Sequence, residues 1–286
     1  MLNQYLLSVL MTCYNREKYI AEAIESVLNS TYKTLELIIV DDGSIDNTVK
    51  IAKFYAIKDR RIRIFVNEKN LGDYPNRNKA ASYARGEFMM YVDSDDKILP
   101  DGFAQCIQAM QKFPYASFGM QLHGKQGTPF YLAASEAIHR HFFQHPCLMI
   151  GPGGTILRRS FFEKIGEYPV KYGPANDMYF NLKAVAQDGI VFLPFEFNFY
   201  RIHEGQELNN KYSYLYNGYC YLKDALYELV LPLTASEKEL VAKKNKRRFL
   251  VNLIKYLIQS KDIRKTLKAR SIAGFGWRDA FQAIFH

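Results

Sequence analysis

The sequence predicts an α/β protein in which helices flank a largely parallel central sheet, followed by a helical extension. About the first hundred residues alternate short apolar runs with amphipathic stretches, which is the pattern of strand and helix units around a parallel sheet. Polar residues follow each apolar run, and from about Tyr212 onward the patterning is helical. A chain of 286 residues with 48% hydrophobic side chains can also bury a substantial core.

Four strands and three helices are predicted in this first part of the chain. The apolar runs predict strands over residues 6–12, 35–40, 62–66 and 88–92. Apolar residues recurring at helical spacing predict helices over residues 17–29, 46–57 and 75–84. In open α/β sheets the ligand crevice lies beyond the carboxyl ends of the strands. The polar residues that follow each strand are therefore the candidate site.

The second part of the chain is less regular. Residues 113–130 mix Pro, Gly and short apolar runs, which predicts loops and irregular strands. The remaining predictions are helices over 135–144 and 177–186, a Gly/Pro turn over 151–154, and strands over 190–193 and 197–202. We expect one domain over residues 1–205, made of two halves (1–105 and 106–205), and a helical extension over 206–286.

Composition indicates a cytoplasmic protein with affinity for polyanions. The apolar run at residues 6–12 is too short for a signal sequence or a spanning helix. The four cysteines have no metal-ligand spacing, so we interpret them as reduced structural thiols. A net charge of +9 favours contact with nucleic acid, anionic lipid headgroups or phosphorylated substrates.

An acidic cluster, Asp93, Asp95 and Asp96, directly follows the fourth predicted strand. Three carboxylates within four residues repel one another unless solvent or a cation intervenes. Mg²⁺ and similar hard ions take oxygen ligands and share their shell between one or two carboxylates and substrate phosphates. The cluster therefore indicates a divalent metal site, although a capped helix start on a solvated turn explains it equally well when it is considered alone.

Two further strand ends carry polar residues at the same predicted edge of the sheet. Asp41 and Asp42 end the second strand, and Thr12 to Asn15 end the first. A carboxylate there can accept a hydrogen bond from a nucleobase, and the ring of Tyr14 can stack on one. A tight turn made possible by Gly43 is the alternative interpretation, but it leaves the two adjacent acids unexplained.

Together these motifs resemble the family 2 inverting glycosyltransferases, which have the GT-A fold. The resemblance rests on Tyr14-Asn15 after the first strand, Val40-Asp41-Asp42-Gly43-Ser44, the Asn70/Gly72/Asn78 pattern, Ala84-Arg85-Gly86-Glu87 and Asp93-Ser94-Asp95-Asp96, in that order. It covers about the first 105 residues closely and extends more loosely to about His203.

The resemblance implies roles for the residues at these strand ends. Thr12, Tyr14 and Asp42 would hold the nucleobase, with Asp41 beside them. Asp93 would contact the ribose.

Asp95 would ligate the Mn²⁺ or Mg²⁺ ion that bridges the two phosphates of a nucleotide-sugar donor. Asn15 and Arg16 are further candidates for this donor site. Arg77 is the cation expected near the donor, unless it is a surface-facing arginine.

The general base of the family is the aspartate of an acidic pair at the start of a helix behind the acceptor. The matching position here is Asp177, preceded by Asn176 where Glu is commoner. In an inverting transfer one carboxylate within hydrogen-bond reach of the acceptor hydroxyl is sufficient. The alternative for Asp177 is an acid that stabilises the helix N-terminus.

Residues on the acceptor side complete the resemblance. Gly153 lies in the Gly151-Pro152-Gly153-Gly154 segment, where glycines permit close backbone approach. Arg201 and His203 resemble the strand end that closes over the diphosphate, and they are candidates for diphosphate, metal or acceptor contacts. The expected acceptor is a saccharide or a lipid-linked saccharide.

A basic stretch, KKNKRRFLVNLIKYLIQSK, lies in the predicted C-terminal helices. Such a helix can lie on an anionic membrane surface, which would make the protein peripheral on the inner face of the membrane, or it can pack on the catalytic domain. We expect no nucleic-acid binding, because the basic residues match no recognition motif.

Other classes of protein fit the sequence less well. A nicotinamide-dependent dehydrogenase requires a glycine-rich turn after the first strand, and Thr12 to Asn15 contain no glycine. A nucleotidyltransferase, or a sugar-nucleotide-binding module without catalytic activity, remains an alternative.

Overall fold

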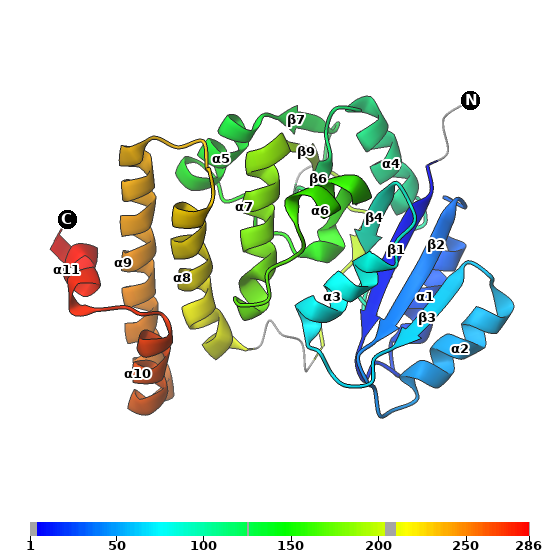
Figure 1. Cartoon of the computed structure of the whole chain (residues 1–286), viewed down its shortest axis with the longest axis horizontal. Coiled ribbons are helices and arrows are strands. Elements are labelled where there is room, and N and C mark those ends of the chain that lie inside the picture. Colours follow the sequence, from blue (N-terminus) through cyan, green and yellow to red (C-terminus); the bar gives the residue numbers. More distant parts are fainter. Residues whose placement is uncertain (1–4, 125, 204–209, 286) are drawn as a thin grey trace.

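The structure is a computed structural model that describes residues 5–124, 126–203 and 210–285. Its centre is an eight-stranded sheet with helices on both faces, and the last four helices form one end of the molecule (Figure 1). Helices α1 (Ile20–Asn29) and α2 (Thr48–Lys58) lie at the opposite end.

The strands of the main sheet lie in the order β3-β2-β1-β4-β8-β6-β9-β7. Their bounds are β1 Leu7–Cys13, β2 Leu35–Asp41, β3 Ile62–Val66, β4 Phe88–Tyr91, β6 Phe118–Gln121, β7 Phe130–Leu132, β8 Thr155–Arg158 and β9 Ile190–Leu193. The pairings β1–β2, β1–β4, β2–β3 and β6–β9 are parallel, whereas β8 runs antiparallel to both of its neighbours and β7 antiparallel to β9. The predicted fold class, a largely parallel sheet flanked by helices, is confirmed.

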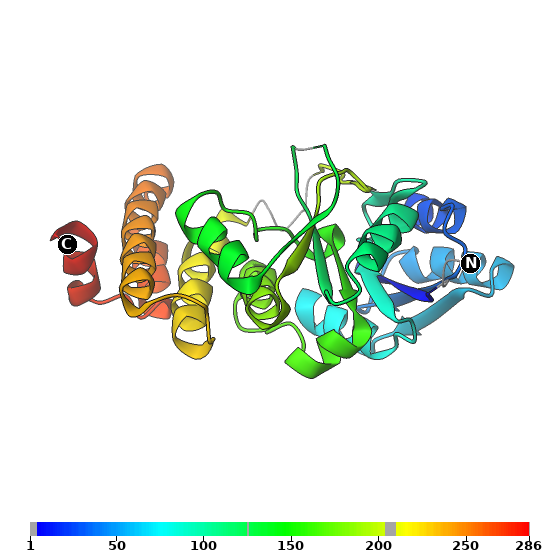
Figure 2. The same ribbon diagram turned by 90° about the horizontal axis from the view of Figure 1, so that it is seen from above.

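Helices cover the sheet on both sides (Figure 2). Besides α1 and α2, their bounds are α3 Asp73–Ser82, α4 Gly102–Lys112, α5 Ala134–Phe143, α6 Arg159–Ile165 and α7 Asn176–Asp188. The C-terminal helices are α8 Lys211–Glu228, α9 Ala235–Ser260, α10 Ile263–Ile272 and α11 Trp277–Phe285. A second, two-stranded sheet pairs β5 (Lys97–Ile98) with β10 (Asn198–Phe199) in antiparallel orientation.

The core consists of two apolar layers, one on each face of the sheet. Every residue of β1 is buried, and alternate side chains point to opposite layers: Val9 and Met11 pack in the layer with α1 and α4, and Leu10 packs in the layer with α3 and α7. This burial on both faces explains why the strand is a continuous apolar run.

The strands and helices predicted in the first part of the chain agree with the structure to within about three residues at each end. In the second part, the prediction of loops and irregular strands over 113–130 agrees with most of the described residues there but is wrong at β6, which is a regular, fully buried strand inside the sheet. It contains Gly119, where a side chain would meet Ile156 and Met110, so that a residue typical of loops here permits close packing.

Three other outcomes concern this second part. The strand predicted over 197–202 is only the two residues of β10. The predicted domain boundary at 205/206 lies outside the described residues. Among the helices of the described residues, none is both long enough and apolar enough to span a bilayer.

The four cysteines are free, and three of them are buried. The C-terminal helices have a small core of their own, which contains Tyr219, Phe249 and Phe275. Part of the basic stretch is used in this packing, since Lys246 forms an ion pair with Asp279 at 2.8 Å.

Gly86 provides a test of the packing beside β1. A Cβ atom at this position would lie 2.5 Å from the Leu6 carbonyl oxygen and 2.7 Å from the Ser8 nitrogen, both of which are backbone atoms. We predict that Gly86→Ala lowers the free energy of unfolding by about 1–3 kcal/mol, measured by urea denaturation. Gly218→Ala is the control, because no atom lies within 4 Å of its added Cβ and helix α8 favours Ala by about 0.5–1 kcal/mol. Equal effects at both sites would contradict this account of Gly86.

Candidate active site

The ends of the parallel strands bring the predicted site residues to one edge of the sheet. In the register of β1 and β2, Cys13 lies opposite Asp41, so Tyr14 and Asp42 leave the sheet together. Strand β4 is parallel to β1 on its other side and is followed within two residues by Asp93. The sheet topology therefore places these polar residues together along one edge.

Asp41 stabilises the turn after β2. Its Oδ2 accepts hydrogen bonds from the backbone nitrogens of Gly43, at 3.0 Å, and Ser44, at 2.8 Å. The adjoining turn after β1 is fitted to this one, because Asn15 has a φ of 53° and its backbone nitrogen donates to Ser44 Oγ at 2.8 Å. A positive φ is uncommon outside glycine, and asparagine tolerates it better than most residues.

Asp42 holds the loop between β3 and α3. Its Oδ1 accepts hydrogen bonds from Asn67 Nδ2 and from the Leu71 nitrogen, both at 2.8 Å, and its Oδ2 accepts one from the Gly72 nitrogen at 2.9 Å. Gly72 has a φ of 90°, which explains the glycine in the motif. Since a carboxylate oxygen can accept two hydrogen bonds, Oδ2 of Asp42 retains capacity for one more donor.

The two side chains expected to complete the nucleobase site differ in accessibility. Tyr14 follows β1 with 43% of its surface exposed, so that its ring is free to stack on a flat ligand. Thr12, inside β1, is buried.

Arg77 is a buried cation and not the surface-facing arginine of the alternative interpretation. It forms ion pairs with Asp73 at 2.8 Å and Asp93 at 2.7 Å. Burial alone would lower the pKa of Arg77, but the two carboxylates raise it well above its ordinary value, so the guanidinium stays charged. Arg77 thus joins helix α3 to the residues that follow β4.

Asp95 lies between a cation and an imidazole. Its Oδ2 is 3.0 Å from Arg16 Nε and 3.0 Å from His203 Nε2. The antiparallel pairing of β5 with β10 brings His203 to this position from more than a hundred residues away. The ring of His203 also packs on Tyr19, with 4.7 Å between the ring centroids.

Arg201 fixes the segment after β10 to the acidic cluster. Its backbone nitrogen donates to Asp96 Oδ1 at 2.9 Å, and its guanidinium binds the Asp95 carbonyl oxygen at 2.9 Å and Glu22 at 2.8 Å. Burial raises the pKa of Asp96 to about 7, against the opposing effect of this backbone hydrogen bond. Asp96 and Arg201 therefore position the segment that carries His203.

The residues around Asp95 fit a divalent cation. Within the described residues no three potential ligands of the His, Cys, Asp and Glu types come together. A carboxylate and an imidazole do meet, at Asp95 and His203. Ions that bind through one or two protein groups and complete their shell with phosphates and water require no more than this. Mn²⁺ accepts both kinds of ligand, whereas Mg²⁺ favours oxygen.

Asp177 is buried in the first turn of helix α7. Burial raises the pKa of its carboxyl to about 7 from an ordinary 3.8, although a hydrogen bond from the Met178 nitrogen and the charge of Arg77 act in the opposite direction. A carboxylate with a pKa near neutrality is suited to accept a proton from a hydroxyl.

The segment before β8 connects the two groups of carboxylates. A Cβ added to Gly153 would lie 3.7 Å from Asp93 Oδ2, and one added to Gly151 would lie 3.6 Å from Asp177 Oδ2. The carbonyl oxygen of Gly153 is held by Asn198 Nδ2 at 3.0 Å. Side chains at the two glycines would fill the space beside Asp93 and Asp177, and we refer to this space along the Gly151–Gly154 segment as the cleft.

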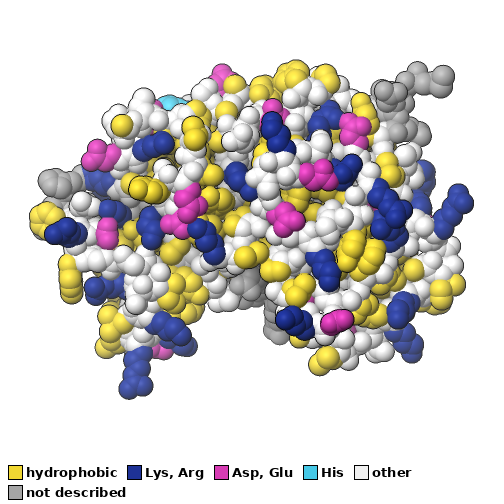
Figure 3. Space-filling view, viewed as in Figure 1, with side chains coloured by type: hydrophobic (Ala, Val, Ile, Leu, Met, Phe, Trp, Pro, Cys, Tyr) yellow, Lys and Arg dark blue, Asp and Glu magenta, His cyan; other side chains and the backbone are white. Residues whose placement is uncertain are grey.

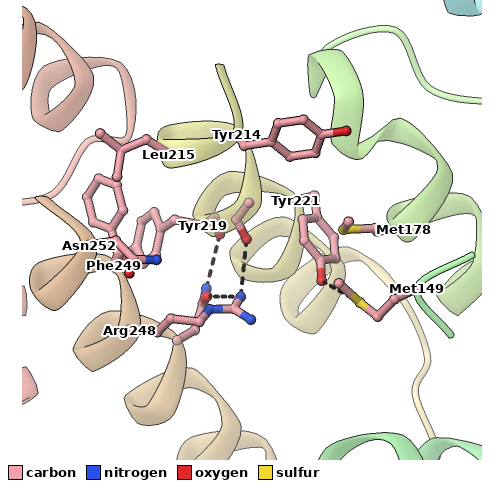
Figure 4. A pocket seen from close by; sticks show the side chains of 11 residues that line it. Met149, Met178, Tyr214, Leu215, Tyr219, Tyr221, Arg248, Phe249 and Asn252 are labelled. Carbon is pink, nitrogen blue, oxygen red and sulfur yellow. Dashed lines mark hydrogen bonds between the residues drawn. The ribbon is translucent and has the colours of Figure 1, made fainter. Parts of the chain in front are cut away.

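A pocket of about 170 Å³ opens beside α7, between it and helices α8 and α9 (Figure 4). Met149 and Met178, next to the cleft, form one side, and Arg248 and Phe249 of α9 form the other. Tyr221 and Met178, the residue after Asp177, line the pocket; burial raises the pKa of Tyr221, Arg248 acts in the opposite direction, and the charge of Asp177 adds a smaller rise. The pocket is therefore close to the Asp177 carboxylate.

Two residues of this region were not predicted as part of the site. Asp73 pairs with Arg77 while 55% of its side chain is accessible, and its charge raises the pKa of Asp177. Asn78 joins α3 to Tyr168. Its Oδ1 accepts a hydrogen bond from the Tyr168 backbone nitrogen at 3.1 Å, and its Nδ2 donates one to the Tyr168 carbonyl oxygen at 2.9 Å. In the sequence, Asp73 precedes Arg77 by four residues, and this spacing on one helix could have indicated the ion pair between them.

The fold and this arrangement define the class to which the protein belongs. The chain superimposes with a TM-score of 0.73 on TarS residues 1–349 from S. aureus, solved with UDP-GlcNAc, at 21% identity over 97% of this chain and 81% of that one. It is also similar to the mannosyltransferase PcManGT from Pyrobaculum calidifontis, solved with GDP-Man and Mn²⁺, with a TM-score of 0.63 and 12% identity over 99% and 84% of the two chains. The fold is GT-A, as predicted.

The sequence comparison gives the family. The profile of Glycosyl transferase family 2 matches residues 8–166, which is more than half of the chain, and the chain belongs to this family. The E. coli enzyme WfgD, a UDP-Glc:alpha-D-GlcNAc-diphosphoundecaprenol beta-1,3-glucosyltransferase, is 39% identical over 112 residues, covering 39% of this chain and 43% of WfgD. The matched segments span half or less of the curated relatives.

The buried carboxyl of Asp177 predicts a pH-dependent cost to stability. Between pH values of about 4 and 7, the native state holds a proton that the unfolded chain has released, so stability falls as the pH rises through this window. We predict that Asp177→Asn is about 2–4 kcal/mol more stable than the wild type at pH 8, and equally stable near pH 4, by urea denaturation.

Asp59→Asn is the control for this measurement. Hydrogen bonds from Arg61 lower the pKa of Asp59, so removal of its charge should destabilise the protein at pH 8. An Asp177→Asn protein that is less stable than the wild type at pH 8 would contradict the raised pKa.

Proposed function

We propose that this protein transfers a sugar from a nucleoside-diphosphate donor to a hydroxyl group of an acceptor, with inversion at the anomeric carbon. The observation that carries the proposal is that one short segment runs beside both groups of acids: Gly153 lies next to Asp93, which follows β4 with Asp95, and Gly151 lies next to Asp177 in the first turn of α7. Membership of Glycosyl transferase family 2 supports the same reaction.

The donor would lie along the strand ends. Tyr14 offers an exposed ring for stacking on the base, and Asp42 offers the remaining acceptor capacity of Oδ2 to a base N–H. Thr12, Asn15 and Asp41 would shape this pocket, and Asp93, oriented by Arg77, would accept hydrogen bonds from the ribose. UDP-sugars are the proposed donors, since TarS and WfgD are described with UDP-linked sugars.

A divalent cation, Mn²⁺ or Mg²⁺, would be held by Asp95, with His203 as its neighbour, and when bound it neutralises the leaving diphosphate. Arg16 pairs with Asp95 and lies within reach of the same negative charge. Arg201 holds His203 over this part of the cleft through its contacts with Asp96 and Glu22.

Asp177 would act as the general base. The acceptor oxygen attacks the anomeric carbon from the side opposite the diphosphate, and its proton passes to the Asp177 carboxylate. Asn176 adds no charge beside Asp177, because its amide is neutral, and its Nδ2 donates to the Gly173 carbonyl oxygen within its own turn at 2.7 Å. The pocket beside α7 is the proposed entrance for the acceptor.

The proposed acceptor is a cell-surface saccharide or a lipid-linked saccharide, and the proposed place of action is the cytoplasmic face of the membrane. The acceptor named for WfgD is carried on diphosphoundecaprenol, and other relatives include the teichuronic acid glycosyltransferase TuaG of Bacillus subtilis.

The metal proposal is tested by hydrolysis of UDP-sugars in the absence of an acceptor. We predict release of UDP in the presence of Mn²⁺, abolished by EDTA and lowered about 100-fold or more in Asp95→Ala, because a bound cation contributes several kcal/mol to stabilisation of the leaving group. Asp101→Ala, a change at an exposed carboxylate, should leave the rate unaltered. Release of pyrophosphate from UTP and a sugar 1-phosphate, without release of UDP from UDP-sugars, would identify a nucleotidyltransferase, and binding without turnover a non-catalytic module.

The role of Asp177 is tested by sugar transfer to a saccharide acceptor. We predict that Asp177→Asn lowers kcat by about 10²–10⁴-fold, the usual contribution of a general base, while the Kd for the donor stays within about twofold. In the wild type, kcat/KM should rise with pH through about 7, as the carboxyl loses its proton, and then level off. Asp188→Asn, at the other end of α7, is the matched control. Unchanged transfer in Asp177→Asn would refute the assignment.

A further inference from the structure

The last three helices carry well exposed apolar side chains on their surface. These residues lie at helical spacing on each helix: Ile254 and Ile258 on α9, Ile263 and Leu267 on α10, and Trp277 and Phe281 on α11. They are well exposed, from 51% at Ile254 to 79% at Trp277. We refer to them, with the lysines and arginines of residues 251–285, as the C-terminal surface.

The opposite sides of the same helices form the core of this region. Leu253, Ala269 and Ala283 are buried, whereas Ile254, Leu267 and Ile284 beside them in the sequence are exposed. An α-helix in a globular protein normally has one apolar stripe, and here the stripe that faces the core is already present. The exposed side chains are therefore a second apolar face, available to a partner.

The charge of this region indicates what kind of partner it fits. Residues 251–285 contain seven lysines and arginines and two acids, Asp262 and Asp279. Both acids interact within the protein. At the start of α10, Asp262 accepts a hydrogen bond from the Lys265 backbone nitrogen at 2.8 Å, and Asp279 forms an ion pair with Lys246 at 2.8 Å. In Figure 3 hydrophobic and basic side chains lie side by side over the end of the molecule that carries α9 to α11.

We propose that the C-terminal surface docks on an anionic lipid bilayer. Aliphatic and aromatic side chains at helical spacing enter the boundary between headgroups and acyl chains, while lysines and arginines around them bind the lipid phosphates. A second copy of this chain is a poorer occupant, because it would bring the same excess of cations against the first. The helices lie on the bilayer, since none in the described residues can span it.

This location corrects the expectation drawn from the basic stretch. Phe249 and Leu253, which lie in that stretch, are buried, and Arg248 faces the pocket beside α7. The residues available to a bilayer are those further along, from Ile254 to Phe281. The first part of the basic stretch therefore packs on the protein, and the proposed membrane contact involves residues further along the same helices.

Docking would have a consequence for the reaction, which rests on the proposed function. Helices α8 and α9 form one wall of the pocket next to Asp177, and α10 packs on both of them. A protein held to the bilayer through α9 to α11 would keep its acceptor side near lipid-linked saccharides. The docking itself does not depend on the chemistry in the cleft.

The proposal is tested by co-sedimentation of the full chain with vesicles. The vesicles consist of phosphatidylcholine alone, or of phosphatidylcholine mixed with phosphatidylglycerol. We predict binding to the mixed vesicles that weakens with added salt, and little binding to the neutral ones. Two variants should each weaken this binding about tenfold or more: Lys255, Arg264 and Lys268 all changed to Glu, and Ile258→Ser combined with Leu267→Ser.

Matched controls are available on α2, at the other end of the molecule. Lys50 and Lys53 on this helix and Arg60 just after it, changed to Glu, alter the net charge equally, and Phe54→Ser with Ile57→Ser removes apolar side chains that are 53% and 88% exposed. Controls that lose as much binding as the test variants would overturn the proposal, as would equal binding to neutral vesicles or none to either kind. Self-association that the test variants abolish would assign the surface to a second copy.

Hydrolysis of UDP-sugars in solution separates this proposal from the proposed function. The docking variants should hydrolyse the donor at the wild-type rate while failing to sediment with vesicles. If the wild-type protein does not hydrolyse any UDP-sugar, sugar transfer is refuted, but the docking result is unaffected.

Discussion

The candidate site depends on one buried cation, the guanidinium of Arg77. It pairs with Asp73 on its own helix and with Asp93 after β4, and its charge also lowers the pKa of Asp177. The hydroxyl of Tyr91 donates to the backbone carbonyl oxygen of Arg77 at 3.0 Å, which fixes α3 against β4. Because an unpaired charge at this depth is very costly, the surrounding carboxylates and the cation require one another. Arg77 thus allows several acids to face a single cleft.

The two parts of the sheet meet at the same place. Asn78, one turn after Asp73 and Tyr74 on α3, binds the backbone of Tyr168, and the Gly151–Gly154 segment passes between Asp93 and Asp177. The pairing of β5 with β10 adds His203 and Arg201 to the cluster after β4. The contacts of Asn78 with Tyr168 and of Asp95 with His203 join residues 90 and 108 positions apart, so the geometry of the cleft is a property of the complete fold and not of one motif.

The sequence predicts the parallel part of the fold well because buried strands and amphipathic helices leave clear patterns, and it predicts the strand ends because polar residues follow each apolar run. It does not reveal β6, because Gly119 and the prolines nearby suggest a loop, whereas in the structure Gly119 permits close packing. Contacts between distant side chains, such as Asp95 with His203 and Arg77 with Asp93, require the folded chain. The same holds for Asp42, whose hydrogen bonds to the loop before α3 follow from three-dimensional position.

The central claim is that the carboxylates after β4 and at the start of α7 face one sugar nucleotide. A crystal structure of the protein with UDP and Mn²⁺ tests it most directly. The account predicts anomalous density for manganese at Asp95, the uracil ring beside Tyr14, and the diphosphate on the side of the cleft that faces Asp177. Nucleotide or metal bound elsewhere on the molecule, with the cleft occupied only by water, would contradict it.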